Sequence, residues 1–184
     1  MGRPVTVTTP SDREVTVVRD FGAPARLIWD AHTKPELMKR WLFGPPGWSM
    51  PHCAVDLRVG GRYRYVWKND ETGAQFGSYG EHREVVPFER IVTTENMDGV
   101  GGQPFNLEPP WGSQVPSVNT LTLAEAGGKT TLTVTMRFPS KDIRDRALRS
   151  GMSDGMALGY DRLEAIAAEF AASGAQSCNI GRLA

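Results

Sequence analysis

His82 is the side chain whose sequence surroundings best fit acid–base chemistry. It lies in the stretch Gln75–Val86, where the two-residue period of a strand predicts that it shares a face with Gly80 and Glu84. A histidine beside a carboxylate can act as a general base. More often such a pair forms a structural hydrogen bond or an exposed ladder, and we assign no residue a catalytic role.

Asn119 is a second polar candidate, because it alternates with Leu121 and Leu123 in a strand-like stretch. If the leucines face inward, the amide lies in apolar surroundings, where a polar group costs free energy unless it is hydrogen-bonded. Its partner can be a ligand, a water molecule or the backbone.

Three aromatic residues, Tyr63, Tyr65 and Trp67, alternate along another strand-like stretch. Such a stripe can be core packing or the wall of a cavity, and the polar atoms of Tyr and Trp favour a pocket or a wet edge. Trp41 and Trp48 lie in or beside Gly/Pro-rich loops, where they can gate an entrance or plug the end of the fold.

The C-terminal stretch carries Gly151, Gly155 and Gly159, and each costs a helix about 1 kcal/mol relative to alanine. Close packing on a sheet, room for a ligand beside Met152 and Met156, or a helix break near Gly151 could each explain these glycines. Methionines adapt to irregular apolar shapes, which suits a permissive pocket. The residues predicted to bind a ligand are Trp41, Trp48, Tyr63, Tyr65, Trp67, His82, Asn119, Met136, Met152, Met156 and Tyr160.

The sequence lacks the motifs of common nucleophile, phosphate and metal enzymes: it has no GxSxG, no HExxH, no P-loop and no GxGxxG that opens a helix. Cys53 and Cys178 form no CxxC pair, which disfavours a disulfide framework and a zinc site. We therefore expect no cofactor and no metal. A cyclase or hydrolase that uses His82, Glu84 or a tyrosine is the least favoured function.

The 184 residues carry 21 basic and 21 acidic side chains, and this zero net charge disfavours a nucleic-acid partner or a polybasic membrane anchor. No apolar run reaches the ~18–20 residues of a membrane span, and the first residues lack the apolar core of a signal peptide. The length predicts a single domain, and the two widely separated cysteines indicate a reducing cytoplasm. The sequence leaves the oligomeric state open between a monomer and a homodimer.

Two hydrophobic periods divide the chain, one of strands and one of helices. The only long amphipathic element is the last helix, so a curved antiparallel sheet is expected to wrap around it in an α+β architecture. Met97–Ser117 is rich in Gly and Pro and is predicted to be a long loop that is functional or disordered. The expected elements are strand Glu14–Phe21, short helices 24–33 and Pro35–Trp41, strands Met50–Leu57, Arg62–Lys68, Gln75–Val86, Arg90–Asn96, Val118–Glu125 and Thr130–Phe138, and a helix from Ser140 to about Ala172.

Four segments carry a family resemblance: FGAPARLIWDAHTKPELMKRWLFGP from Phe21, DLRVGGRYRY from Asp56, REVVPFERIVTTE from Arg83 and SGMSDGMALGYDRLE from Ser150. In this order they resemble the START-like (SRPBCC) superfamily, in its branch of activator-of-heat-shock-protein-90-ATPase homologues. The resemblance covers residues 14–170. It implies the helix-grip fold, in which two short helices follow the first strand and a cavity lies between the sheet and the long C-terminal helix.

The resemblance also implies a range of functions. Members bind lipids, hormones, polyketides or other apolar molecules, a few are cyclases or hydrolases, and those that name the branch are cochaperones of the stress response. We expect a carrier or sensor of a small apolar or amphipathic molecule, with a cochaperone-like module that binds a chaperone as the alternative. The domain is expected over residues 14–172, between an N-terminal extension (1–13) and a C-terminal tail (173–184).

Overall fold

The computed structural model describes residues 4–99 and 115–180, of which residues 98–99 and 173–180 are described as backbone only. Within these residues eight strands form one antiparallel sheet in the order β1-β2-β8-β7-β6-β5-β4-β3. The strands are β1 (Thr6–Thr8), β2 (Glu14–Phe21), β3 (Trp48–Val55), β4 (Arg62–Asn69), β5 (Gln75–Val86), β6 (Arg90–Gly99), β7 (Ser117–Ala126) and β8 (Lys129–Arg137).

Four helices complete this part of the chain: α1 (Ala25–Thr33), α2 (Pro35–Trp41), α3 (Lys141–Arg149) and α4 (Met152–Ile180). α1 and α2 follow β2, as the sequence predicted. The C-terminal helical stretch expected from Ser140 is divided into two helices, and this confirms the break near Gly151 that was one of the three predicted explanations for the glycines. Gly151 separates α3 from α4 with a φ of +81°, a backbone conformation that glycine adopts without steric cost.

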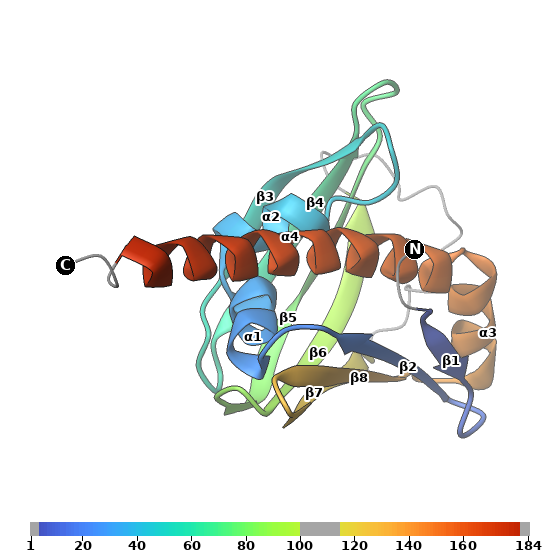
Figure 1. Ribbon diagram of the computed structural model, residues 1–184. Helices are drawn as coiled ribbons and strands as arrows, with labels where there is room; N and C mark the ends of the chain where they lie inside the picture. The colour runs from blue at the N-terminus through green and yellow to red at the C-terminus, as the bar shows by residue number, and fades with distance from the viewer. Residues whose placement is uncertain (1–3, 100–114, 181–184) are drawn as a thin grey trace.

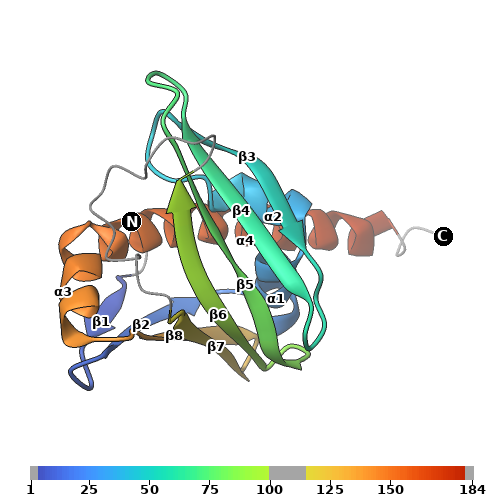
Figure 2. The same cartoon turned by 180° about the vertical axis from the view of Figure 1, so that it is seen from behind.

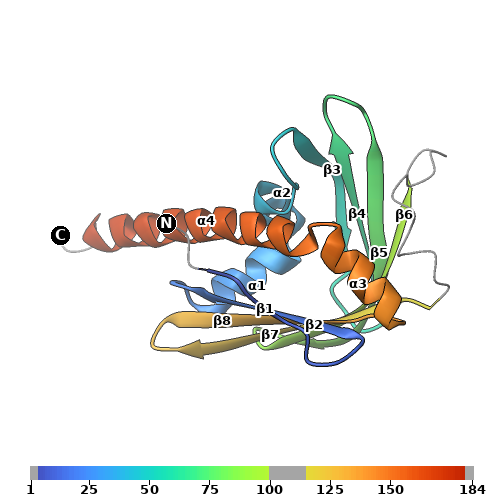
Figure 3. The same ribbon diagram turned by 90° about the vertical axis from the view of Figure 1, so that its right-hand side faces the viewer.

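The sheet is curved, and α4 lies along its concave side (Figure 1; Figure 3). α1 and α2 lie on either side of α4, and α3 leads into its N-terminal end (Figure 3). Seen from behind, β4, β5 and β6 cross in front of α4 (Figure 2). This arrangement confirms the helix-grip α+β fold.

The main core fills the space between α4 and the strands β2 and β8. Val15, Val17 and Leu132 on the strands and Leu163 on α4 are at most 1% exposed. Fully burying one such side chain contributes about 1.5–3 kcal/mol to stability. Val17 lies in this core, and by the sheet register it shares its face with its partner Val134. The face of the sheet that carries these residues therefore points toward α4. We call this the concave face.

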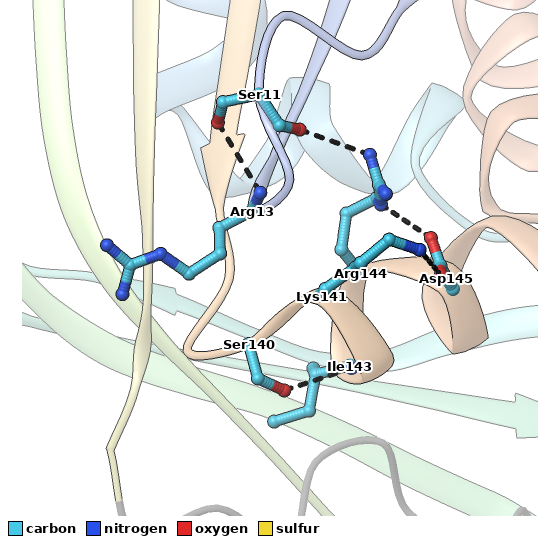
Figure 4. Close-up of polar contacts among 7 residues, drawn as sticks. All are labelled: Ser11, Arg13, Ser140, Lys141, Ile143, Arg144 and Asp145. Atoms are coloured by element: carbon cyan, nitrogen blue, oxygen red, sulfur yellow. Dashed lines mark hydrogen bonds and ion pairs between the residues drawn. The ribbon is translucent and has the colours of Figure 1, made fainter.

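α3 is held in place by hydrogen bonds at its first turn (Figure 4). Ser140 caps the helix by accepting a hydrogen bond from the Ile143 amide at 3.3 Å. Arg144 is buried, donates to the Ser11 carbonyl oxygen at 3.1 Å and lies beside Asp145. These contacts tie the segment before β2 to α3.

The structure bears on two regions that the sequence left open. β1 lies in the predicted N-terminal extension and pairs with β2 along Thr6–Thr8. Within the predicted loop Met97–Ser117, residues 97–99 continue β6 and Ser117 begins β7. Residues 100–114, including Trp111, lie outside the described residues.

Candidate functional site

Several polar residues lie side by side on the concave face of β4, β5, β6 and β7. In the sheet register His82 pairs with Thr93, Thr93 with Asn119, and Asn119 with Met136 of the main core. Tyr63 on β4 pairs with Gly80 on β5, which lies two residues before His82 on the same strand. We call six of these residues the polar cluster: Tyr63, Tyr65, Ser78, His82, Glu95 and Asn119.

Glu95 is the residue that joins the cluster together. One of its carboxylate oxygens accepts a hydrogen bond from the Ser78 hydroxyl at 2.8 Å, and the other accepts one from the Asn119 amide at 2.7 Å. Glu95 was not among the predicted site residues. Alternation within Arg90–Asn96 places Glu95 on the face of Ile91, but its meeting with Asn119 depends on a register between separate strands that local periodicity does not give.

Glycines give the cluster its close packing. A Cβ added to Gly80 would lie 1.9 Å from the Thr94 carbonyl oxygen and 3.0 Å from a ring carbon of Tyr63. Glycine is therefore required where the Tyr63 ring crosses β5. The Gly60–Gly61 turn fixes His82 by backbone hydrogen bonds of 2.8 and 2.9 Å.

His82 is only 3% exposed, and neither of its ring nitrogens has a hydrogen-bond partner among the described residues. Its ring lies 5.7 Å from that of Tyr63, centroid to centroid. Burial lowers the pKa of His82, and the nearby Asp56 carboxylate opposes this effect. The imidazole is thus neutral near pH 7 and offers one donor and one acceptor.

Glu84 does not share a face with His82, and this prediction is wrong. The register shifts between the two residues, so that Glu84 pairs with Val92 while His82 pairs with Thr93. This β-bulge turns Glu84 to the opposite face, where the Arg90 guanidinium donates to it at 3.0 Å. The histidine–carboxylate pair on which the acid–base hypothesis was built is absent.

The predicted aromatic stripe is present and runs from the cluster along the concave face. We call Tyr63, Tyr65, Trp67 and Phe76 the aromatic strip. Centroid distances between successive rings are 4.8, 6.0 and 4.9 Å in that order, and Trp48 lies 5.4 Å from Phe76. Although they face α4, Tyr65, Trp67 and Phe76 are only half-buried, in contrast to the closed core under β2 and β8.

The tyrosine hydroxyls are neutral groups. Burial raises the pKa of Tyr63 and of Tyr65, and the Glu95 carboxylate adds to the effect on both. The Tyr63 hydroxyl donates to the Thr94 carbonyl oxygen at 2.8 Å. Trp67 donates its indole N–H to the Leu42 carbonyl oxygen at 2.5 Å.

Cys53 lies beside this strip in a small apolar cluster with Met38 and Met50. Burial raises the pKa of its thiol to about 11. The thiol is therefore protonated near pH 7 and is a poor nucleophile.

Trp41 and Tyr160 lie in the main core rather than at its edge. The Trp41 indole donates to the Ala31 carbonyl oxygen at 2.9 Å and stacks on the Tyr160 ring at 5.8 Å. Both side chains are at most 4% exposed. Gly159 allows this contact, because a Cβ there would approach the Trp41 ring to 3.3 Å.

The predicted methionines lie around the same core. Met136 is buried beside Asn119 in the sheet register, while Met152 and Met156 are half-buried and pack against the core cluster. The register thus brings Tyr63, Tyr65, Trp67, His82 and Asn119 together on one face of the sheet. Trp41 and Tyr160 belong instead to the main core, and Trp48 lies next to Phe76 at the end of the aromatic strip.

A separate groove of about 520 Å³ lies between α1, α2 and the C-terminal half of α4. Sequence reasoning did not predict it. Leu27, Leu37 and Phe170 form its apolar part, and Arg26 and Glu36 lie at its border. It is therefore an alternative location for an apolar molecule.

The described residues show neither a membrane-spanning helix nor a cluster of metal ligands. None of their helices is both long and apolar enough to cross a membrane. They also contain no group of three or more His, Cys, Asp and Glu side chains placed to hold a metal ion.

Comparison with known proteins places this geometry in a family. The family described as "Activator of Hsp90 ATPase homolog 1-like protein" matches residues 22–168, which include the whole polar cluster. The chain belongs to this family. Its fold commonly binds hydrophobic ligands. Among curated proteins, none matches the chain.

Solved structures share this fold. A crystal structure of a Rhodobacter sphaeroides protein is 25% identical, with a TM-score of 0.76, over 90% of this chain and 99% of that chain. A Nitrosomonas europaea protein is 26% identical, with a TM-score of 0.72, over 89% and 99% of the two chains. A Mycobacterium smegmatis protein is 24% identical, with a TM-score of 0.74, over 89% and 96%, and it supports the fold alone.

Proposed function

We propose that this protein binds a small amphipathic molecule on the concave face of its sheet. The aromatic strip would contact the apolar part of the molecule, and the polar cluster would hydrogen-bond its head group. The observation that carries the proposal is His82, a buried imidazole with both ring nitrogens unpartnered among the described residues. An unpaired buried polar group costs about 1–3 kcal/mol, and a ligand that pairs with it would recover this free energy.

Two further observations support the proposal. The side-chain oxygen of Asn119, Oδ1, is also buried without a partner among the described residues, although the side-chain nitrogen, Nδ2, donates to Glu95. Tyr65, Trp67 and Phe76 keep part of their surface accessible on the same face. Apolar walls with a few convergent polar groups are the usual composition of a small-molecule site.

A fluorescent apolar probe, N-phenyl-1-naphthylamine, tests the location. We expect saturable binding to the wild-type protein and about tenfold weaker binding to Tyr65→Ala, because the ring contact is lost. Tyr79→Ala is the matched control, since Tyr79 lies on the convex face of β5 and is 42% exposed. It should bind like the wild type.

Binding of the probe in the groove beside α4 is the outcome that would contradict the proposal. If Phe170→Ala weakens probe binding while Tyr65→Ala does not, the probe occupies the groove and the proposed site is wrong. Circular dichroism of each variant checks that the fold is kept.

A cochaperone-like interaction module remains a second proposal, supported by the name of the family. An assay of the ATPase activity of bacterial Hsp90, with and without this protein, tests it. Stimulation by the wild-type protein would support this role, whereas unchanged turnover would contradict it.

A further inference from the structure

The polar cluster carries an uncompensated negative charge. Glu95 has no ion-pair partner among the described residues, and both of its hydrogen bonds come from neutral groups, Ser78 and Asn119. Two arginines on the concave side of the sheet bind other groups. Arg162 donates to the Gly44 carbonyl oxygen at 2.5 Å, and Arg19 forms its ion pair with Asp161 at 2.9 Å.

Arg64 lies on the same strand as the tyrosines but on the other face. Its guanidinium lies 5.5 Å from the ring of Tyr79, which is on the convex side. It therefore does not neutralise the carboxylate from within the cluster. A head group that carries a negative charge, such as a fatty-acid carboxylate, would be repelled by Glu95.

Glu95 and Asn119 contribute hydrogen-bond acceptors that no described residue uses. A carboxylate has about four lone-pair sites, and the described contacts of Glu95 use one on each oxygen. The buried Asn119 oxygen is a further free acceptor among the described residues. The Tyr63 hydroxyl is already committed as a donor to the backbone of β6. The site therefore favours a head group that is rich in donors.

The faces of the neighbouring aromatic rings also favour a positively charged head group. The Tyr63 and Tyr65 rings lie 4.8 Å apart beside Glu95, and Trp67 follows at 6.0 Å from Tyr65. Cations are attracted to the faces of aromatic rings, and the attraction is larger where water is excluded. A carboxylate, free acceptors and aromatic faces thus all select a protonated amine.

We propose that the concave face binds a cationic amphiphile whose primary ammonium group is held by Glu95 and Asn119 and whose apolar chain lies along Tyr65, Trp67 and Phe76. This inference rests on the proposed function and adds the chemical class of the ligand. A primary ammonium supplies three N–H donors, and the unused acceptors of Glu95, of the Asn119 side chain and of the neutral His82 ring can receive them.

Three probes of equal chain length test the class: decylamine, decanol and decanoate, each used below its micellar concentration to displace N-phenyl-1-naphthylamine. We expect decylamine to bind on the order of tenfold more tightly than decanol, the gain of one charge-assisted hydrogen bond, and decanoate to bind least. Equal binding of decanol and decylamine overturns the ammonium proposal and leaves ligand binding intact. If no probe binds and N-phenyl-1-naphthylamine itself does not, the proposed function fails as well.

Glu95→Gln assigns the effect to the carboxylate. The amide keeps an acceptor oxygen but removes the charge, so decylamine should lose about tenfold in affinity while decanol binding stays within twofold. Glu84→Gln is the matched control, because Glu84 lies on the convex face and is ion-paired with Arg90. An equal loss in both variants, or none in Glu95→Gln, overturns the assignment. The wild-type series decides the ligand class even if Glu95→Gln does not fold.

Discussion

His32 and His82 show how single buried side chains depart from their ordinary chemistry. His32 lies at 4.8 Å from the Trp41 ring, donates from Nδ1 to the Ile28 carbonyl oxygen at 2.7 Å, and has no partner for Nε2 among the described residues. Burial lowers the pKa of His32 from 6.5 to about 4. Neither position could be recognised as buried from the residue type alone.

This pKa predicts acid sensitivity. The unfolded chain binds a proton on His32 near pH 6.5, whereas the folded chain does so only near pH 4, so stability falls as the pH drops through this range. Between pH 7.5 and 4.5 the loss due to His32 is about 2–3 kcal/mol. The pKa of His82 is lowered too and acts in the same direction.

Urea unfolding at the two pH values measures the effect. His32→Leu cannot titrate, so its free energy of unfolding should depend on pH less than that of the wild type by this amount. The comparison uses the change with pH, so a lower overall stability of the variant does not matter. Equal pH dependence of the two proteins would contradict the buried neutral state of His32.

The strands and helices could be predicted from local sequence patterns, whereas a β-bulge and the contacts between strands could not. The stretches Glu14–Phe21 and Gln75–Val86 have the predicted bounds, because alternation and flanking turn residues define them. The bulge after His82 is a one-residue shift that alternation cannot detect, and it reversed the predicted face of Glu84. Glu95 was missed for a related reason, because its partners come from other strands.

The three glycines of the C-terminal region have different roles, and this gives a prediction for α3 and α4. Gly151→Ala should destabilise the protein by about 1–2 kcal/mol, because the residue has a φ of +81°. Gly155→Ala should stabilise it by about 1 kcal/mol, because a Cβ there meets nothing within 4 Å and alanine favours the helix.

Chemical denaturation of both glycine variants checks this difference in sign. The pair is matched, since each variant adds one methyl group four residues apart in the chain. Destabilisation by Gly155→Ala would show that the space beside this turn of α4 is occupied and would contradict the packing described here.

At the scale of the whole molecule, the concave face of the sheet has two regions that differ in how completely they are buried. Under β2 and β8 the concave face is closed by α4, with Val15 and Leu132 fully buried. Across β4 to β6 the same face bears half-buried aromatic rings and hydrogen-bonding groups without partners among the described residues. The sequence predicted the fold and part of this surface, because both depend on the alternation of side chains along strands. It could not predict the groove beside α4, which forms from three helices that meet only in the folded chain.

The most direct test of ligand binding on the concave face is an NMR titration of ¹⁵N-labelled protein with N-phenyl-1-naphthylamine. The predicted result is saturable shifts of the backbone amides of Tyr65, Ser78 and Glu95 and of the ring nitrogens of His82, which have no partner among the described residues. Shifts confined to the groove, at Leu27, Leu37 and Phe170, would contradict the account.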